Sequence, residues 1–153
     1  MHRRFIEIVV RFLSLICFVF FSASTWGTTA TELLSCEVLD EEGVSLRLAE
    51  QNGQLVYTLS SGQNKASQVE FLTPANKVVY RFWDNAGQYK SYLVVLRRND
   101  YVYTVYASYD SWSGLDANGV TVEHNEVFEA DHKCHPVKVK SNLMAYVTKN
   151  LSR

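Results

Sequence analysis

The sequence predicts a mostly β protein: an antiparallel β-sandwich or a small β-barrel of about eight strands, with a short C-terminal helix. Two observations support this fold class. Short segments rich in Tyr, Val and Leu alternate apolar with polar residues, which is the period of a strand with one buried face. Turn-forming Gly, Asn and Asp separate these segments every eight to twelve residues or so, as in sandwiches and barrels, and the pattern does not distinguish the two.

The central segment is a predicted β-hairpin that runs from Tyr89 to Tyr109. Both arms are rich in residues that favour strands, and Asn99 and Asp100 supply the turn between them. Neither arm has a purely polar face, so we expect an inner strand pair that is covered on both sides.

A second hairpin is predicted over residues 44–60, because Asn52-Gly53 is a typical tight-turn pair between two alternating segments. Residues 110–119 are expected to form the longest irregular stretch. The alternation predicts further strands at residues 32–40, 67–73, 77–83, 120–123 and 126–130.

The alternation ends after Pro136, where the spacing becomes helical. Leu143, Val147 and Leu151 would share one helical face, and Ser141 is expected to cap the helix start. The sequence therefore predicts a short helix at the C-terminus.

The N-terminus predicts export. Residues 1–27 read as a secretory signal peptide, with basic Arg3, Arg4 and Arg11, a ten-residue run at 12–21 that is apolar apart from Ser14, and small residues after it. An uncleaved membrane anchor is the alternative, but a spanning helix needs about 20 apolar residues. We therefore expect a single domain over residues 28–153 that is periplasmic or secreted and not bound to a membrane after cleavage.

Cys36 and Cys134 are the two cysteines that remain after such cleavage. An even number of cysteines in an exported chain predicts a disulfide. The bond would join the first strand of the mature chain to the last part of the β domain.

The charge balance argues against nucleic-acid binding. Removing residues 1–27 takes away three of the 15 basic and one of the 16 acidic residues, which leaves a formal charge of −3. Binding to nucleic acids depends on neutralising phosphates with basic side chains. An acidic run would instead attract a basic protein partner, and it comprises Asp110, Asp116, Glu123, Glu126, Glu129 and Asp131.

No metal, cofactor or catalytic residue is predicted. His124, His132 and His135 lie near Cys134, but their spacing matches no zinc finger, and a disulfide sulfur does not ligate zinc. The stretch 116–119 resembles only a fragment of a calcium loop, since its acidic first and twelfth ligands are missing. The familiar serine-nucleophile, metalloprotease and phosphate-loop motifs are absent, and a carboxylate pair for glycoside hydrolysis cannot be recognised from sequence.

Aromatic residues beside predicted loops are the main functional signal, because Tyr and Trp dominate protein–protein hot spots. We predict a partner-binding surface that comprises Trp83, Tyr109, Asp110, Trp112 and Asp116. The favoured hypothesis is a non-enzymatic envelope protein, an inhibitor or immunity-type protein that blocks a hydrolase or toxin. A small-ligand or glycan-binding, lectin-like barrel is the alternative, and a homodimer is compatible with either.

Overall fold

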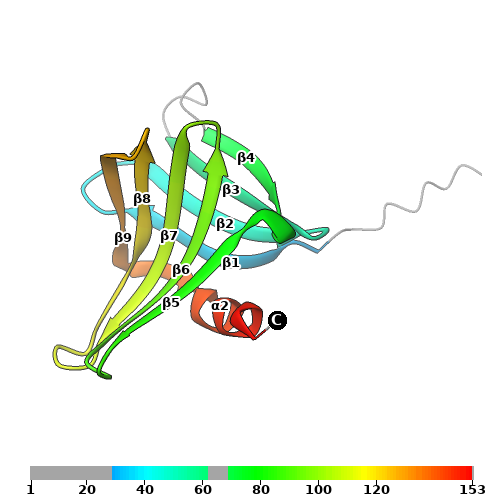
Figure 1. The fold of residues 1–153 in the computed structure, drawn as a ribbon. Helices are drawn as coiled ribbons and strands as arrows, with labels where there is room; N and C mark the ends of the chain where they lie inside the picture. Colours follow the sequence, from blue (N-terminus) through cyan, green and yellow to red (C-terminus); the bar gives the residue numbers. More distant parts are fainter. Residues whose placement is uncertain (1–28, 62–68, 153) are drawn as a thin grey trace, which may run out of the picture.

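The computed structural model of the chain describes residues 29–61 and 69–152. The predicted signal peptide over residues 1–27 lies outside the described residues. The described part is mostly antiparallel β with a short C-terminal helix, as predicted (Figure 1). The strands are β1 (Thr31–Val38), β2 (Val44–Gln51), β3 (Gln54–Ser61), β4 (Val69–Pro74), β5 (Val79–Asn85), β6 (Tyr89–Arg98), β7 (Tyr101–Asp110), β8 (Leu115–His124) and β9 (Val127–Ser141), with a 3-10 turn η2 (Ala75–Lys77) and the helix α2 (Leu143–Leu151).

The strands form one curled sheet and not two stacked sheets. Nine described strands, one more than the approximate eight expected, follow the order β4-β3-β2-β1-β9-β8-β7-β6-β5. Every neighbouring pair is antiparallel. The sheet curves into a half-barrel whose edge strands, β4 and β5, do not pair with each other (Figure 1). Neither a sandwich nor a closed barrel describes this fold.

The two predicted hairpins are present as β2–β3 and β6–β7, with Asn52 and Asn99 at positive φ in their turns. The predicted boundaries differ most from the structure at β8 and β9. The irregular stretch is shorter than expected, because β8 already begins at Leu115, which pairs with Asp110. Strand β9 runs on to Ser141, well beyond the predicted end at residue 130, since Pro136 lies in a bulge and interrupts the strand without ending it.

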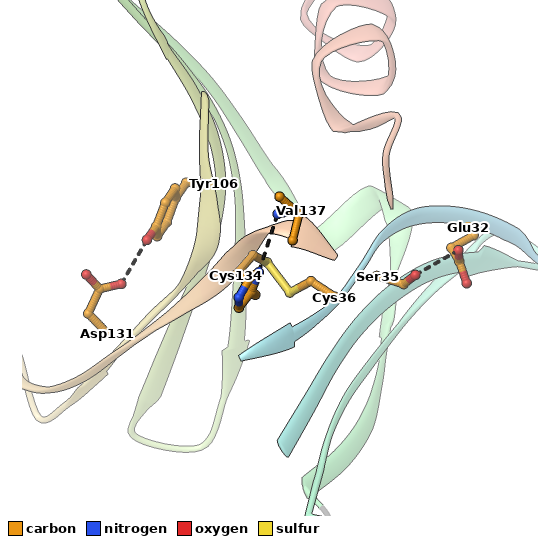
Figure 2. The surroundings of a disulfide bond; sticks show 8 residues. Glu32, Ser35, Cys36, Tyr106, Asp131, Cys134 and Val137 are labelled. Atoms are coloured by element: carbon orange, nitrogen blue, oxygen red, sulfur yellow. Dashed lines mark hydrogen bonds between the residues drawn. A yellow bond between two sulfur atoms is a disulfide. The ribbon is translucent and has the colours of Figure 1, made fainter. Parts of the chain in front are cut away.

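The two halves of the sheet meet where β1 pairs with β9. Cys36 lies opposite Val139 and Val38 opposite Cys134, so residues 135–138 bulge out of the ladder. The predicted disulfide joins Cys36 to Cys134 at this interruption, with Cα atoms 5.5 Å apart (Figure 2). The bond therefore links β1 and β9 at the point where the hydrogen bonds between these two strands are interrupted.

The hydrophobic core lies on the concave face of the sheet, and α2 covers one end of it (Figure 1). Leu143 and Val147 on the helix are fully buried. The helix begins one residue later than expected, with Asn142 as its first flanking residue. Asn142 donates from its backbone N–H to the Leu33 carbonyl at 2.8 Å, which anchors the helix start to β1.

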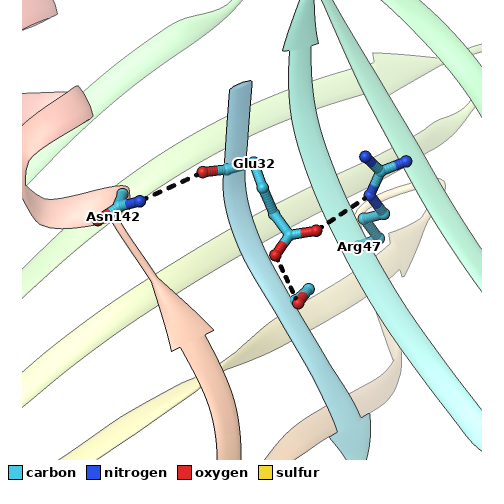
Figure 3. A network of polar contacts seen from close by, with 4 residues as sticks. Glu32, Arg47 and Asn142 are labelled. Carbon is cyan, nitrogen blue, oxygen red and sulfur yellow. Dashed lines mark hydrogen bonds and ion pairs between the residues drawn. The ribbon is translucent and has the colours of Figure 1, made fainter. Parts of the chain in front are cut away.

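A polar network on β1 supports this anchor (Figure 3). The Glu32 carboxylate accepts hydrogen bonds from Ser35 Oγ at 2.9 Å and from Arg47 Nε at 3.3 Å. The Glu32 carbonyl accepts from Asn142 Nδ2 at 3.4 Å. The helix start is therefore tied to β1 by both backbone and side chain.

Three aromatic rings join the two halves of the sheet across the concave face. Tyr57 on β3 lies 5.0 Å from Phe71 on β4 and 5.1 Å from Tyr103 on β7, measured between ring centroids. Tyr57 is fully buried, and its hydroxyl has no hydrogen-bond partner among the described residues. Burial raises the pKa of this hydroxyl. We call these three residues the aromatic bridge.

On the convex face, Tyr106 crosses over Gly119. The Tyr106 hydroxyl donates to Asp131 Oδ1 at 3.0 Å, which links β7 to β9 over the intervening strand β8 (Figure 2). A Cβ at position 119 would lie 2.5 Å from the His132 carbonyl oxygen and 2.6 Å from the Tyr106 hydroxyl. Glycine is needed here because there is no room for a side chain.

Removing the disulfide is expected to destabilise the fold strongly. The bond closes a separation of 98 residues, for which the chain-entropy relation gives roughly 4–5 kcal/mol. We predict that Cys36→Ser with Cys134→Ser lowers the free energy of unfolding by an amount of this order, measured by urea denaturation. Reduction of the wild-type protein should give the same loss, and an unchanged midpoint would contradict the prediction.

Gly119→Ala is expected to cost roughly 1–3 kcal/mol, the usual range for overpacking a close-packed position. The double variant Gly119→Ala with Tyr106→Ala should recover only part of the loss, because the His132 carbonyl remains in the way. Urea denaturation of both variants and of Tyr106→Ala alone measures this. A Gly119→Ala protein as stable as wild type would show that the strands can move apart freely.

Candidate functional site

The predicted partner-binding residues gather at the far end of two long hairpins, β5–β6 and β7–β8 (Figure 1). We call residues 83–90 and 109–116 the hairpin tip. Ser111 holds the two turns together, because its backbone N–H and its hydroxyl both donate to the Gln88 carbonyl at 2.8 Å. The two turns therefore form one unit.

Asp110 shapes the loop at the tip. Its carboxylate accepts from the backbone N–H of Trp112 at 2.9 Å and from Ser113 Oγ at 2.8 Å. Its carbonyl accepts from the Gly114 N–H at 2.8 Å. The hydrogen bond from the Trp112 N–H, followed by that from the Ser113 hydroxyl, holds the pKa of the Asp110 carboxyl below its usual value. The loop is thus ordered before any partner binds.

Large apolar side chains on this ordered tip face solvent. Trp112 is 82% exposed, Leu115 69% and Trp83 52%. The Trp83 ring contacts Tyr89 edge-on, with centroids 5.5 Å apart. A gathering of exposed aromatic and aliphatic groups on a rigid loop is typical of an interaction site.

The strand pairing places the five predicted residues on different sides of the tip. Trp83 pairs with Ser91, which pairs in turn with Ser108 on β7. Asp110 lies two residues beyond Ser108 on the same strand, so Trp83 and Asp110 both lie on the convex face. Tyr109 and Asp116 are directly paired and lie on the concave face. Trp112 stands at the end between them. The site is therefore a protrusion with two sides, not a flat patch.

The acidic run does not form one surface. The hairpin tip holds Asp84, Asp110 and Asp116 against a single Lys90. The remaining acidic residues of the run lie on β8, on β9 and in the turn between them, roughly 16–30 Å from Asp116 at about 3.3 Å per strand residue. There His124 pairs with Glu129 at 3.2 Å. Only the tip carboxylates lie beside the exposed tryptophans.

The histidines are spread over separate contacts. His132 Nδ1 lies 2.7 Å from Glu41 Oε1, and the His124 ring stacks on Tyr101 at 4.3 Å between centroids. His135 Nδ1 accepts from the Val137 N–H at 3.4 Å. Within residues 29–61 and 69–152, no three His, Cys, Asp or Glu side chains are grouped so as to hold a metal ion.

A second feature, which the sequence reasoning missed, is a cavity of about 430 Å³ on the concave face at the end opposite the tip. We call it the mouth cavity. It lies beside the aromatic bridge, and Tyr103 belongs to both. The one sequence signal was the pair Tyr101 and Tyr103 on the same strand face; the other lining residues come from strands far apart in the chain. They include Leu59, Val69, Arg98, Val122, Glu129 and His132.

The fold and the two sites define an antiparallel half-barrel with an ordered hairpin tip at one end and a cavity at the other. No protein-family model, no curated protein and no solved structure matches the chain. In the described part of the chain, no helix has the length and apolar character required to cross a bilayer.

Acid should disorder the tip loop. Because the folded loop lowers the pKa of Asp110, its stabilising effect is complete above the ordinary value of 3.8 and is lost as the pH falls through the lowered pKa. We expect the backbone amide resonance of Trp112 to titrate with a midpoint below 3.8 in an NMR pH series.

Asp110→Asn should abolish this titration, whereas Asp84→Asn, in the neighbouring turn, should leave it unchanged. A Trp112 midpoint at or above 3.8 in the wild-type protein would show that the Asp110 contacts do not order the loop.

Proposed function

We propose that the protein is an exported, non-enzymatic binding protein of the cell envelope, whose hairpin tip enters a basic cleft of a protein partner. The partner class is an envelope hydrolase or toxin that this protein blocks as an inhibitor or immunity-type protein. The observation that carries the proposal is Trp112, 82% exposed on a loop that Asp110 and Ser111 hold in place.

The order of the tip loop favours a binding role for Trp112 over a ring that is exposed without a function. A loop that is already ordered loses little conformational entropy when it binds, so more of the contact energy appears as affinity. Trp is also the residue most enriched in hot spots, where it fills a pocket on the partner. Trp112 combines the two properties.

The shape and charge of the tip favour a cleft over a flat surface. Trp83 and Tyr109 present aromatic rings on opposite faces, so a partner has to surround the tip to contact both. Three carboxylates against one lysine suit a basic cleft. A hydrolase that acts on an anionic polymer would offer such a cleft. The disulfide supports an oxidising compartment, where such an envelope partner would be found.

Trp112→Ala is expected to weaken partner binding by 2 kcal/mol or more, about thirtyfold, as for a central hot-spot residue. The partner is first captured from envelope extract with the mature domain and identified. Its affinity and its hydrolytic activity are then measured with purified proteins. Wild type should inhibit that activity, and Trp112→Ala should not.

Phe128→Ala is the matched control, because Phe128 is a 63% exposed aromatic residue on β9, outside the tip. It should bind as wild type does. Equal affinity of the Trp112→Ala and wild-type proteins would refute the tip as the binding surface. A bound partner whose activity is unaffected would refute the inhibitor role while leaving the surface intact.

A further inference from the structure

The mouth cavity has the size and lining of a small-molecule site. Its volume of about 430 Å³ lies within the range of ligand pockets, and its lining is mainly apolar with a few polar groups. Leu59 and Val69 contribute from β3 and β4, and Val122 from β8. The two halves of the curled sheet thus provide opposite walls.

The floor of the cavity is rigid. Tyr103 lines it and is packed against Phe71 at 4.8 Å and against Tyr57 at 5.1 Å between ring centroids. Tyr101 beside it is held by the stacked His124 ring. An apolar ligand would meet aromatic surface that does not have to rearrange.

The charged and titratable side chains that line the cavity differ in whether they form an ion pair. The Glu129 carboxylate is engaged by His124 at 3.2 Å, and His132 is engaged by Glu41 at 2.7 Å. Arg98 has no carboxylate within ion-pair distance in the described part of the chain. Its guanidinium donates to the Glu70 carbonyl at 3.3 Å and lies 5.5 Å from the Phe71 ring centroid.

Arg98 therefore keeps donors for a ligand. A guanidinium has five N–H donors, and a single carbonyl contact uses one of them. Its planar fork matches a carboxylate or a similar oxyanion. Contact with the Phe71 ring at the same time places the cation at the edge of the apolar surface.

We propose that the mouth cavity binds a small amphipathic carboxylate, whose apolar body lies against Tyr101 and Tyr103 and whose carboxylate pairs with Arg98. This site is separate from the hairpin tip and does not depend on its role. An uncharged or cationic amphiphile of the same length lacks the group that Arg98 recognises.

The test compares decanoate, decanol and decyltrimethylammonium by isothermal titration calorimetry on the mature protein, below their aggregation concentrations. We expect decanoate to bind most tightly. Arg98→Gln should weaken decanoate about tenfold or more, the usual effect of losing a charge-assisted hydrogen bond, and should leave decanol unchanged.

Arg97→Gln is the matched control, since Arg97 precedes Arg98 and lies on the opposite face of β6. It should not alter the binding of any of the three probes. Decanoate that binds no more tightly than decanol, or equally well to wild type and Arg98→Gln, would overturn the proposal. So would the absence of decanoate binding at millimolar concentration.

Two further measurements locate the probe. Ala130→Phe, which places a ring in the cavity, should abolish decanoate binding while the near-ultraviolet circular dichroism stays native. In the wild-type protein, decanoate should shift the amide resonances of Tyr101 and Val122 and not those of the tip. Shifts confined to the tip or to α2 would place the probe elsewhere and refute the assignment.

Discussion

The pairing of β1 with β9 is the constraint on which the rest of the structure depends. The sheet is a linear series of strands, so in the described chain this pair alone joins its two halves through a backbone ladder. The ladder is interrupted where Pro136 bulges out, and the disulfide between Cys36 and Cys134 joins the strands at that point. Bridging the interruption keeps the halves close enough for the aromatic bridge to form on the concave face. The curl therefore depends on a contact between residues nearly a hundred positions apart.

The curl also explains why the molecule has two distinct ends. The ten-residue strands β6, β7 and β8 are longer than the core that they cover. On β7, Tyr103, Val105 and Ala107 are buried, whereas Tyr109 on the same face is exposed. The strands thus extend past α2 as a tip, while at their other end the aromatic bridge stops short of the rim and leaves the mouth cavity. A strand that continues beyond its core gains little stability there, which agrees with the binding role that we propose for the tip.

Much of this arrangement could be predicted from the sequence, and the rest depends on long-range packing. Alternation and turn residues located both main hairpins, and the number of cysteines indicated the bond between the first and last strands. The curl could not be predicted, because the contacts that accompany it, such as Tyr57 with Tyr103 across the concave face, join strands far apart in the sequence. The predicted strand at residues 126–130 ends well before Ser141, because the later part of β9 pairs with β1 only across the bulge that contains Pro136. The aromatic residues of the tip could be recognised as exposed from the sequence. Their division between two faces could not, because it depends on the register of three adjacent strand pairs, β5–β6, β6–β7 and β7–β8.

The two aspartates of the predicted surface have different physical roles. Both carboxylate oxygens of Asp110 accept hydrogen bonds within the loop, so this charge is already used to hold Trp112 in position. The Asp116 carboxylate makes no hydrogen bond or ion pair in the described part of the chain and lies beside exposed Tyr109. Of these two aspartates, Asp116 is the one whose carboxylate is available to a cation on the proposed partner. Substituting Asp110 changes the shape and the charge of the tip together, whereas substituting Asp116 changes its charge alone. Long-range attraction and loop order can therefore be separated, because salt screens the first and leaves the second in place.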